Sequence, residues 1–236
     1  MAEKGTLYMI PCPIGETPVW DVLPAANLAV MQSLDYFIVE NVRTARRFLS
    51  KAGTGRPIDS LRFEELNEHT PPQDVERLVA PLLGGQNAGM ISEAGVPGVA
   101  DPGAEIAALC HRHGVRVVPL VGPSSILMAL MASGLNGQSF AFNGYLPVKP
   151  PERAKAIRHF ERRAQTERQS QIFIETPYRN IKLFEELLAV CQPQTMLTVA
   201  AGITEPDEFI RTAPVSLWRK APLPDINKRP AIFILL

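Results

Sequence analysis

A carboxylate and a group of arginines follow one short apolar run, and together they could transfer a proton and bind a phosphate. Glu40 comes directly after the apolar run 36–39, and Arg43, Arg46 and Arg47 follow it. A carboxylate placed next to a reacting hydroxyl can act as a general base, and guanidinium groups bind phosphates through paired hydrogen bonds. Arg43 and Arg47 are four residues apart, so they share one helix face. The alternative interpretation is a solvated basic helix that binds no ligand.

A loop rich in glycine and proline is the second candidate for a binding site. Residues 90–103 read Met-Ile-Ser-Glu-Ala-Gly-Val-Pro-Gly-Val-Ala-Asp-Pro-Gly, a density of Gly and Pro that excludes the interior of a helix or strand. Backbone amides in such a loop can approach a ligand closely, and in open α/β sheets ligands bind at the carboxyl ends of strands. The segments 11–15 and 121–125 are shorter loops of the same kind. A plain turn is the alternative for 11–15.

Apolar runs alternate with helical patterns in the first half of the chain, and this alternation places the loops at strand ends. Strands are expected at 6–10, 36–39, 88–91 and 115–120, and helices at 22–31, 73–83 and 104–113. This order predicts a mostly parallel sheet that is covered by helices. The segment 63–66 fits either a short strand or a helical turn.

The second half has a different order of elements and predicts a second α/β domain with a mixed sheet. Strands are expected at 139–143, 171–175, 196–201, 208–212 and 231–236, and helices at 126–132, 152–164 and 181–190. We place the boundary at the Gly122-Pro123 pair, so that the domains span residues 1–122 and 123–236. In helix 152–164 we expect Ile157 and Phe160 to face the core and Arg153 to lie on another, basic face.

The composition indicates a packed protein and excludes several classes. Of the 236 residues, 46% are hydrophobic, so the chain can bury a core and disorder is not expected. A formal net charge of zero argues against a general attraction to nucleic acid but allows a local basic face. No apolar run approaches the ~20 residues that a membrane span needs. No signal peptide is recognisable either, so we expect a cytoplasmic protein without a membrane partner.

The cysteines and histidines predict neither disulfides nor a metal site. Cys12, Cys110 and Cys191 lie far apart in apolar surroundings, as is typical of reduced core residues. His111 and His113 lack the spaced ligand pairs of a zinc site, and we interpret them as residues that complement a helix dipole. The chain has neither a phosphate-loop signature nor a Gly-x-Gly-x-x-Gly turn after its first strand. Nucleotide hydrolases and dehydrogenases are therefore not favoured.

The punctuated segments taken together resemble the tetrapyrrole methylase superfamily of S-adenosylmethionine-dependent methyltransferases. Within it they are most similar to the branch that methylates a ribose 2′-hydroxyl of a cytidine in small-subunit ribosomal RNA. The segments that carry the resemblance, in the order and spacing of the family, are 5–8, 13–15, 40–43, 91–103, 118–124, 132–135, 144–147 and 175–179.

The resemblance implies two α/β domains with S-adenosylmethionine in the cleft between them, and a homodimer. It implies that Glu40 and Arg43 are catalytic and that Gly15, Asn41 and Arg46 bind the substrate. The cofactor-binding residues that it implies are Pro13, Glu93, Ala94, Gly95, Val96, Val99, Ser124, Ser125, Thr176, Pro177, Ala201 and Pro230. In this interpretation Glu40 takes the proton of the acceptor hydroxyl, and Arg43 and Arg46 hold an RNA phosphate.

The sequence departs from the RNA-methylating branch mainly on the substrate side. That branch usually reads Glu-Asp-Thr-Arg where this chain has Glu-Asn-Val-Arg at 40–43, and Asp-Ala-Gly-Thr where it has Glu-Ala-Gly-Val at 93–96. It also usually has Asn in place of Glu16. An amide thus replaces a carboxylate at Asn41, and Val42 and Val96 each replace a hydroxyl with a methyl group. We expect cofactor binding to survive these changes better than the identity of the substrate.

The sequence leaves three functions open. The first is methyl transfer to RNA of the small ribosomal subunit, which the basic residues at 43–51 and 152–164 support. The second is methyl transfer to a small molecule such as a tetrapyrrole, whose carboxylates the same arginines would bind. The third is a catalytically inactive paralogue that binds the cofactor or has lost it, a hypothesis raised by Asn41, Val42 and Val96.

Overall fold

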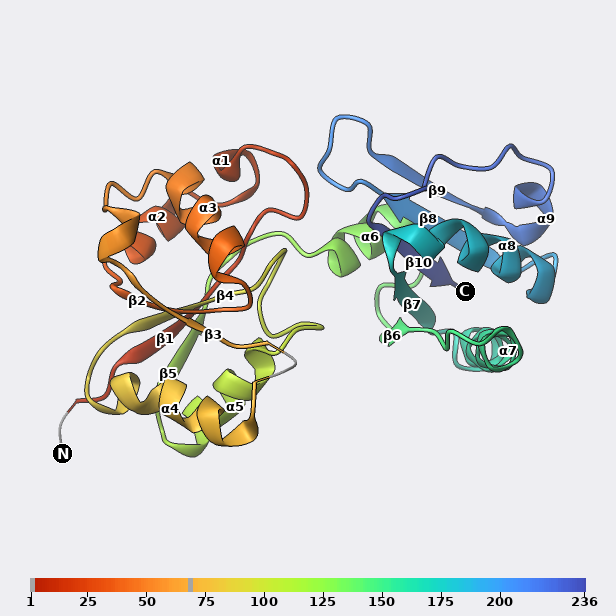
Figure 1. Cartoon of the computed structure of the whole chain (residues 1–236). Helices are drawn as coiled ribbons and strands as arrows, with labels where there is room; N and C mark the ends of the chain where they lie inside the picture. The colour runs from red at the N-terminus through yellow and green to blue at the C-terminus, as the bar shows by residue number, and fades with distance from the viewer. Residues whose placement is uncertain (1–2, 68–69) are drawn as a thin grey trace. The chain divides into compact units, whose positions relative to one another are not determined.

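The computed structural model describes residues 3–67 and 70–236 and divides into two compact units, Met1–Ser124 and Ser125–Leu236. Each unit has its own five-stranded sheet with helices packed on it (Figure 1). The boundary expected from the sequence, after residue 122, lies two residues earlier. No helix among the residues just given is long and apolar enough to cross a membrane.

The sheet of the first unit is entirely parallel, as its alternating sequence predicted. Its strands are β1 (Thr6–Ile10), β2 (Tyr36–Val39), β3 (Arg62–Glu65), β4 (Ala88–Ile91) and β5 (Arg116–Pro119). They are ordered β3-β2-β4-β1-β5, and every neighbouring pair runs parallel. The sequence allowed two structures for the segment 63–66, and its first three residues, 63–65, belong to β3.

Helices cover both faces of this sheet, which explains why its central strands are apolar on both sides. The elements α1 (Val19–Val22), α2 (Ala26–Gln32) and α3 (Val42–Ala52) lie on one face, and α4 (Pro72–Leu83) and α5 (Gly103–Arg112) on the other (Figure 1). A short 3₁₀ helix, η1 (Ile58–Ser60), precedes β3. Along β1, Leu7 and Met9 pack with the α4–α5 core, whereas Ile10 packs with the α1–α3 core.

The order of the strands opens a crevice at their carboxyl ends. The loops after β1 and β2 lead to helices on one face, whereas the loop after β4 leads to α5 on the other face. Because β4 lies between β2 and β1, the chain leaves neighbouring strands in opposite directions. Ligands of open α/β sheets bind at such a switch point. The segments 11–15, 40–43 and 92–102, singled out in the sequence, all lie at this edge.

The prediction of one helix over 22–31 is wrong. The chain forms α1, passes through Leu23 with extended backbone angles (φ −109°, ψ 141°), and starts a new helix only at Ala26. Pro24 is the physical reason, because the residue before a proline is driven away from the helical region.

The second unit has the mixed sheet that was predicted. Its strands are β6 (Phe140–Tyr145), β7 (Ser170–Glu175), β8 (Met196–Ala201), β9 (Phe209–Pro214) and β10 (Ala231–Leu235). Their order is β6-β7-β10-β8-β9, in which only β6 and β7 run parallel. The helices of this unit are α6 (Ser125–Ser133), α7 (Pro150–Glu167), the 3₁₀ helix η2 (Pro177–Arg179), α8 (Asn180–Val190) and α9 (Val215–Trp218).

Helices also cover both faces of the second sheet. Phe173 and Val199 point into a core formed with α7, α8 and α9. Thr212 of β9 points the other way and donates a hydrogen bond from Oγ1 to the Ser133 carbonyl of α6 (2.8 Å). The three cysteines are buried and form no disulfide, as predicted.

Arg153 contradicts the expectation that it lies on an exposed basic face. Its side chain is only 1% exposed. Nε donates to Glu186 Oε2 of α8 (2.6 Å), and Nη1 donates to the Val148 carbonyl (3.2 Å). The ion pair joins α7 to α8, and helical periodicity within α7 cannot reveal a partner that is 33 residues away in the sequence.

We expect Glu186→Ala to lower the free energy of unfolding of the second unit by about 3 kcal/mol, because it leaves the Arg153 charge buried and unpaired. Urea unfolding followed by the fluorescence of buried Trp218, in a Trp20→Phe background, measures this change. The control Glu167→Ala breaks an exposed pair with Arg163 and should leave the free energy of unfolding almost unchanged, because solvent screens such a pair. Equal effects of the two substitutions would show that the buried pair does not hold α7 to α8.

Candidate functional site

Glu40 stands half-buried at the carboxyl end of β2, against the loop that follows β4. Its backbone N–H donates to the Ile91 carbonyl (3.1 Å), and its side-chain Oε2 accepts a hydrogen bond from the Glu93 N–H (3.1 Å). Burial raises the pKa of Glu40, and the negative charges of Glu93 and Asp101 raise it further, against the opposing effect of the Glu93 hydrogen bond. A carboxylate with a raised pKa is a stronger proton acceptor, as a general base requires.

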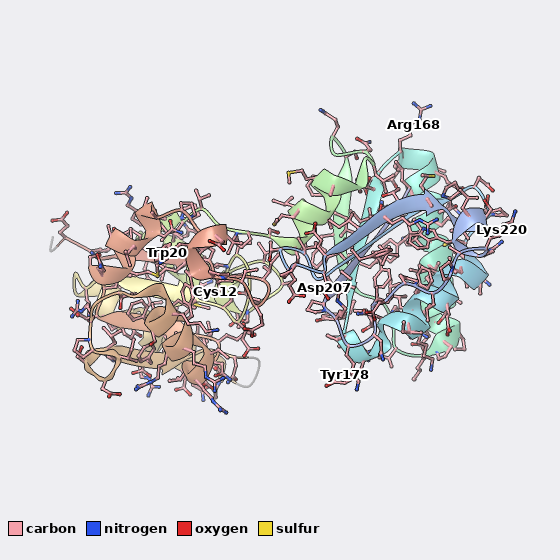
Figure 2. All side chains as sticks on the ribbon, turned by 90° about the horizontal axis from the view of Figure 1, so that it is seen from above. Cys12, Trp20, Arg168, Tyr178, Asp207 and Lys220 are labelled. Atoms are coloured by element: carbon pink, nitrogen blue, oxygen red, sulfur yellow. The ribbon has the colours of Figure 1, made fainter. Side chains whose placement is uncertain are left out.

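The loops after β1 and β4 are joined by two backbone hydrogen bonds. The Cys12 N–H donates to the Gly95 carbonyl (2.8 Å), and the Gly95 N–H donates to the Cys12 carbonyl (3.2 Å). Gly95 has a left-handed backbone (φ +69°), and a Cβ there would lie 3.2 Å from Ile14 Cγ2 and 3.4 Å from the Pro123 oxygen. Only glycine fits this position without strain. Figure 2 labels Cys12 within the first unit.

Asp101 holds the far half of the β4–α5 loop, a role that the sequence analysis missed. Its Oδ1 accepts hydrogen bonds from the Gly98 N–H (2.8 Å) and the Gly103 N–H (2.7 Å). These bonds fix a stretch in which Gly98 (φ +84°) and Ala100 (φ +64°) both have left-handed backbones. The Asp-Pro-Gly sequence before a helix is a turn signal that identifies such a side chain.

A cavity of about 680 Å³ opens beside Glu40 and is strongly acidic. Its lining residues are Glu40, Asn41, Glu65, Asn67, Glu93, Ala100, Asp101, Pro102 and Glu105. The sequence analysis did not select Glu65, Asn67 or Glu105, because they come from β3, the loop after it and α5. These carboxylates make the cavity repel anions. Among residues 3–67 and 70–236, no group of three or more His, Cys, Asp or Glu side chains is arranged to hold a metal ion.

Asn41 forms the start of α3. Its Oδ1 accepts hydrogen bonds from the Arg43 N–H (2.9 Å) and the Thr44 N–H (3.2 Å), so this side chain caps the helix. Asn and Asp are equally good N-caps. The exchange of Asp for Asn that distinguishes this chain from the RNA-methylating branch therefore preserves the position of α3 next to Glu40.

The arginines of α3 differ in what they contact. Arg46 forms an ion pair with Asp59, and its guanidinium lies 5.8 Å from the centre of the Phe63 ring. Arg43 and Arg47 are exposed and make no ion pair or hydrogen bond through their side chains with the part of the chain that the structure describes. The phosphate-binding role of Arg46 stays a prediction, and a phosphate there would compete with Asp59.

The predicted cofactor residues of the second unit gather at one edge of its sheet. Ala231 of β10 pairs with Glu175 of β7 on one side and with Ala201 of β8 on the other. Thr176, which follows β7, and Pro230, which precedes β10, therefore lie at the same edge as Ala201. The Pro230 carbonyl also accepts a hydrogen bond from the Gly202 N–H (3.1 Å).

Glu175 is a buried carboxylate at this edge, and the sequence analysis did not assign it a role of its own. Its side chain is 0% exposed, and Oε1 accepts hydrogen bonds from the Thr176 N–H (2.6 Å) and from Arg179 Nε (2.9 Å). Within the described residues, Glu175 Oε2 and Asn180 Oδ1 are buried without a hydrogen-bond partner. Buried unpaired acceptors are costly, so the edge fits a ligand that carries hydroxyl or amino donors. Tyr178, between them in sequence, is exposed at the surface of the second unit (Figure 2).

The structure brings the predicted residues together in two sets. The set in the first unit is Pro13, Gly15, Glu40, Asn41, Arg43, Glu93, Ala94, Gly95, Val96 and Val99, all on loops or a helix start at the carboxyl edge. The set in the second unit is Thr176, Pro177, Ala201 and Pro230. Ser124 ends the first unit and Ser125 begins both the second unit and α6.

Known proteins resemble the chain along nearly its whole length. The model of the family described as Tetrapyrrole (Corrin/Porphyrin) Methylases matches residues 6–217. The chain belongs to the tetrapyrrole methylase family. It is therefore an S-adenosylmethionine-dependent methyltransferase, which confirms the enzyme class and the cofactor predicted from the sequence.

Among curated relatives of this methyltransferase, ribosomal RNA small subunit methyltransferase I of Escherichia coli O157:H7 is 33% identical over 99% of the chain and 78% of its own length. The protein of that name from Vibrio cholerae serotype O1 is 31% identical over 98% of the chain and 76% of its own length.

Solved structures confirm the predicted α/β fold of the methyltransferase. Uroporphyrin-III-C-methyltransferase from Thermus thermophilus has a TM-score of 0.55 at 20% identity and covers 98% of the chain and 94% of its own. The methyltransferase CobJ has a TM-score of 0.62 at 17% identity, and the match covers 99% of this chain and 94% of CobJ.

We expect Gly95→Ala to weaken the binding of S-adenosylhomocysteine at least 10-fold in a calorimetric titration, because the new Cβ displaces Ile14 or the Pro123 carbonyl. The control is Gly53→Ala at the end of α3. Gly53 has the same left-handed backbone (φ +67°) but no atom within 4 Å of an added Cβ. Both variants should lose comparable thermal stability. A similar loss of affinity in both variants would mean that backbone strain, and not the contacts of Gly95 with Ile14 and Pro123, reduces the binding of S-adenosylhomocysteine.

Proposed function

We propose that the methyl acceptor is a ribose 2′-hydroxyl of a cytidine in small-subunit ribosomal RNA. The observation that supports this best is the similarity, over almost the entire chain, to proteins named ribosomal RNA small subunit methyltransferase I. A tetrapyrrole acceptor has weaker support, since the two solved methyltransferases compared above are 20% and 17% identical and support the fold alone.

In the proposed reaction, Glu40 removes the proton of the acceptor hydroxyl. S-adenosylmethionine, when bound, supplies an electrophilic methyl group on a positively charged sulfur. Glu40 takes the hydroxyl proton as the oxygen–methyl bond forms, and burial beside Glu93 makes it a stronger base than an exposed carboxylate. A reaction of this kind depends on placing the reacting atoms rather than on covalent help. The Cys12–Gly95 hydrogen bonds and Asp101 supply that placement by fixing the loop next to Glu40.

The departures from the RNA-methylating branch are compatible with this proposal. Asn41 keeps the helix cap, and Glu40 and Arg43 are present at their expected places. We therefore favour an active enzyme over the inactive paralogue.

We also propose that the enzyme is a homodimer, and its ribosomal acceptor would place it in the cytoplasm. Residues 117–148 contain no Asp, Glu, Lys, Arg or His. In the part of this segment that belongs to the second unit, the residues Leu127, Met131, Tyr145 and Val148 are more than half exposed. Exposed apolar patches mark interaction sites, and in a two-fold dimer the same patch meets itself. Because this segment carries no charged side chain, two copies of it can pack together without repulsion between like charges.

We expect Glu40→Gln to lower kcat at least 100-fold while the affinity for S-adenosylhomocysteine is unchanged, because the amide cannot take a proton. Methylation of small ribosomal subunits measures kcat, and calorimetry measures the affinity for S-adenosylhomocysteine. In the wild type, kcat/KM should fall with falling pH at a value above the ordinary 4.5 of a glutamate, since the pKa of Glu40 is raised. Full activity of Glu40→Gln would exclude Glu40 as the base.

The same substitution should raise the melting temperature at pH 8. A raised pKa in the folded state means that ionised Glu40 destabilises the fold, so this cost is present above its pKa and absent below about pH 4. The gain in stability should therefore disappear at acid pH. A loss of stability at pH 8 would indicate that Glu40 has a structural role instead.

We expect sedimentation equilibrium to give twice the chain mass of 25.9 kDa for the wild type. Met131→Glu, at a side chain that is 80% exposed, should halve this mass without changing the circular dichroism spectrum, because it places two like charges at the interface. The control Lys220→Glu changes an exposed residue of the same unit outside the apolar patch. A dimer that tolerates Met131→Glu would exclude this face as the interface.

A further inference from the structure

We propose that Arg47 and Lys51, on the exposed side of α3, bind the phosphodiester backbone of the RNA acceptor beside the nucleotide that is methylated. This inference rests on the proposed function and names the residues that select a polyanionic acceptor. Phosphate contacts of this kind fix the position of a nucleic acid without reading its sequence. Phosphate contacts with Arg47 and Lys51 would hold the ribose hydroxyl of the acceptor near Glu40.

Arg47 and Lys51 form a ridge between two cavities of the first unit. The outer cavity, of about 500 Å³, is lined by Arg46, Arg47, Ser50, Lys51 and Ile58. The inner cavity, of about 220 Å³, has Arg47 and Lys51 on the side of α3 and reaches Pro13, Gly15 and Glu93 of the loops after β1 and β4. A chain bound in the outer cavity therefore lies next to the loops predicted to bind cofactor and substrate.

The charges of these two residues are available to a ligand. Arg47 makes no side-chain ion pair or hydrogen bond with residues 3–67 or 70–236. Lys51 Nζ lies 3.6 Å from Glu16, in a pair whose side chains are 68% and 92% exposed. Such an exposed pair is weak because solvent screens both charges, so a phosphate can replace Glu16. Arg46 differs, because Asp59 already neutralises it.

The acidic cavity determines which side of Glu40 the phosphates occupy. Glu93 lines both this cavity and the inner cavity of the ridge. Beyond Glu93 the carboxylates of Glu65, Asp101 and Glu105 repel a phosphate, whereas the ridge attracts it. The RNA backbone would therefore follow α3, with its uncharged nucleoside turned toward Glu40.

The test compares two double variants that remove the same charge from the same unit. Arg47→Gln/Lys51→Gln removes the ridge. Arg112→Gln/Arg116→Gln removes two exposed charges at the opposite edge of the sheet, where α5 ends and β5 begins. Each enzyme is assayed with labelled S-adenosylmethionine and small ribosomal subunits that lack the methyl group, between about 50 and about 200 mM salt.

We expect the ridge variant to lose at least 10-fold in kcat/KM at low salt, mainly through KM, and to bind S-adenosylhomocysteine as the wild type does. The slope of log kcat/KM against log salt should become shallower by about 0.7 for each phosphate that the variant no longer neutralises. The Arg112/Arg116 variant should keep the wild-type slope. Arg47→Lys/Lys51→Arg, which keeps both charges, should recover most of the activity.

Other outcomes separate this inference from the function on which it rests. If the wild type methylates ribosomal subunits and both double variants lose activity equally, or neither does, the ridge is not a phosphate site but the proposed function stands. If the wild type binds S-adenosylhomocysteine but methylates a tetrapyrrole and no ribosomal subunit, the RNA acceptor and the ridge both fail.

Discussion

Two backbone hydrogen bonds between Cys12 and Gly95 are the constraint on which the carboxyl edge of the first sheet depends. They join the loops that leave β1 and β4 toward opposite faces of the sheet. Without these hydrogen bonds, the loop after β1 and the loop after β4 could move independently on the two sides of the crevice. The link requires a residue with a left-handed backbone and no side chain, and Gly95 satisfies both conditions. Asp101 then fixes the remainder of the loop through the amides of Gly98 and Gly103.

This edge separates charges of opposite sign, and Glu40 stands at the border. On one side carboxylates crowd around a cavity, and on the other α3 presents Arg47 and Lys51. Burial and the neighbouring negative charges raise the pKa of Glu40, so the folded protein holds this carboxylate in an unfavourable environment. Perturbed groups of this kind cluster at functional sites. The stability that is lost at Glu40 is the physical basis of its basicity.

In the second unit, antiparallel strand pairs bring the predicted cofactor residues to one edge of the sheet. Because β10 runs antiparallel to both β7 and β8, its first residue lies beside the last residues of these two strands. Glu175 anchors that edge through Thr176 and Arg179. The Arg153–Glu186 pair similarly fixes α7 against α8. Both arrangements bury charge, which is tolerated only because hydrogen bonds and ion pairs compensate it.

The sequence by itself determined the elements and the chemistry of the loops, because periodicity, Gly and Pro act locally: the parallel first sheet, the mixed second sheet and the glycine-rich loop at Gly95 all followed from it. Pro24 divides one expected helix into two, because the residue before a proline is driven out of the helical region. Only the tertiary structure decided which distant side chains meet. The burial of Arg153, the pairing of Arg46 with Asp59 and the carboxylates around Glu40 all depend on contacts between elements far apart in the chain. No pattern within a single helix or strand encodes such contacts.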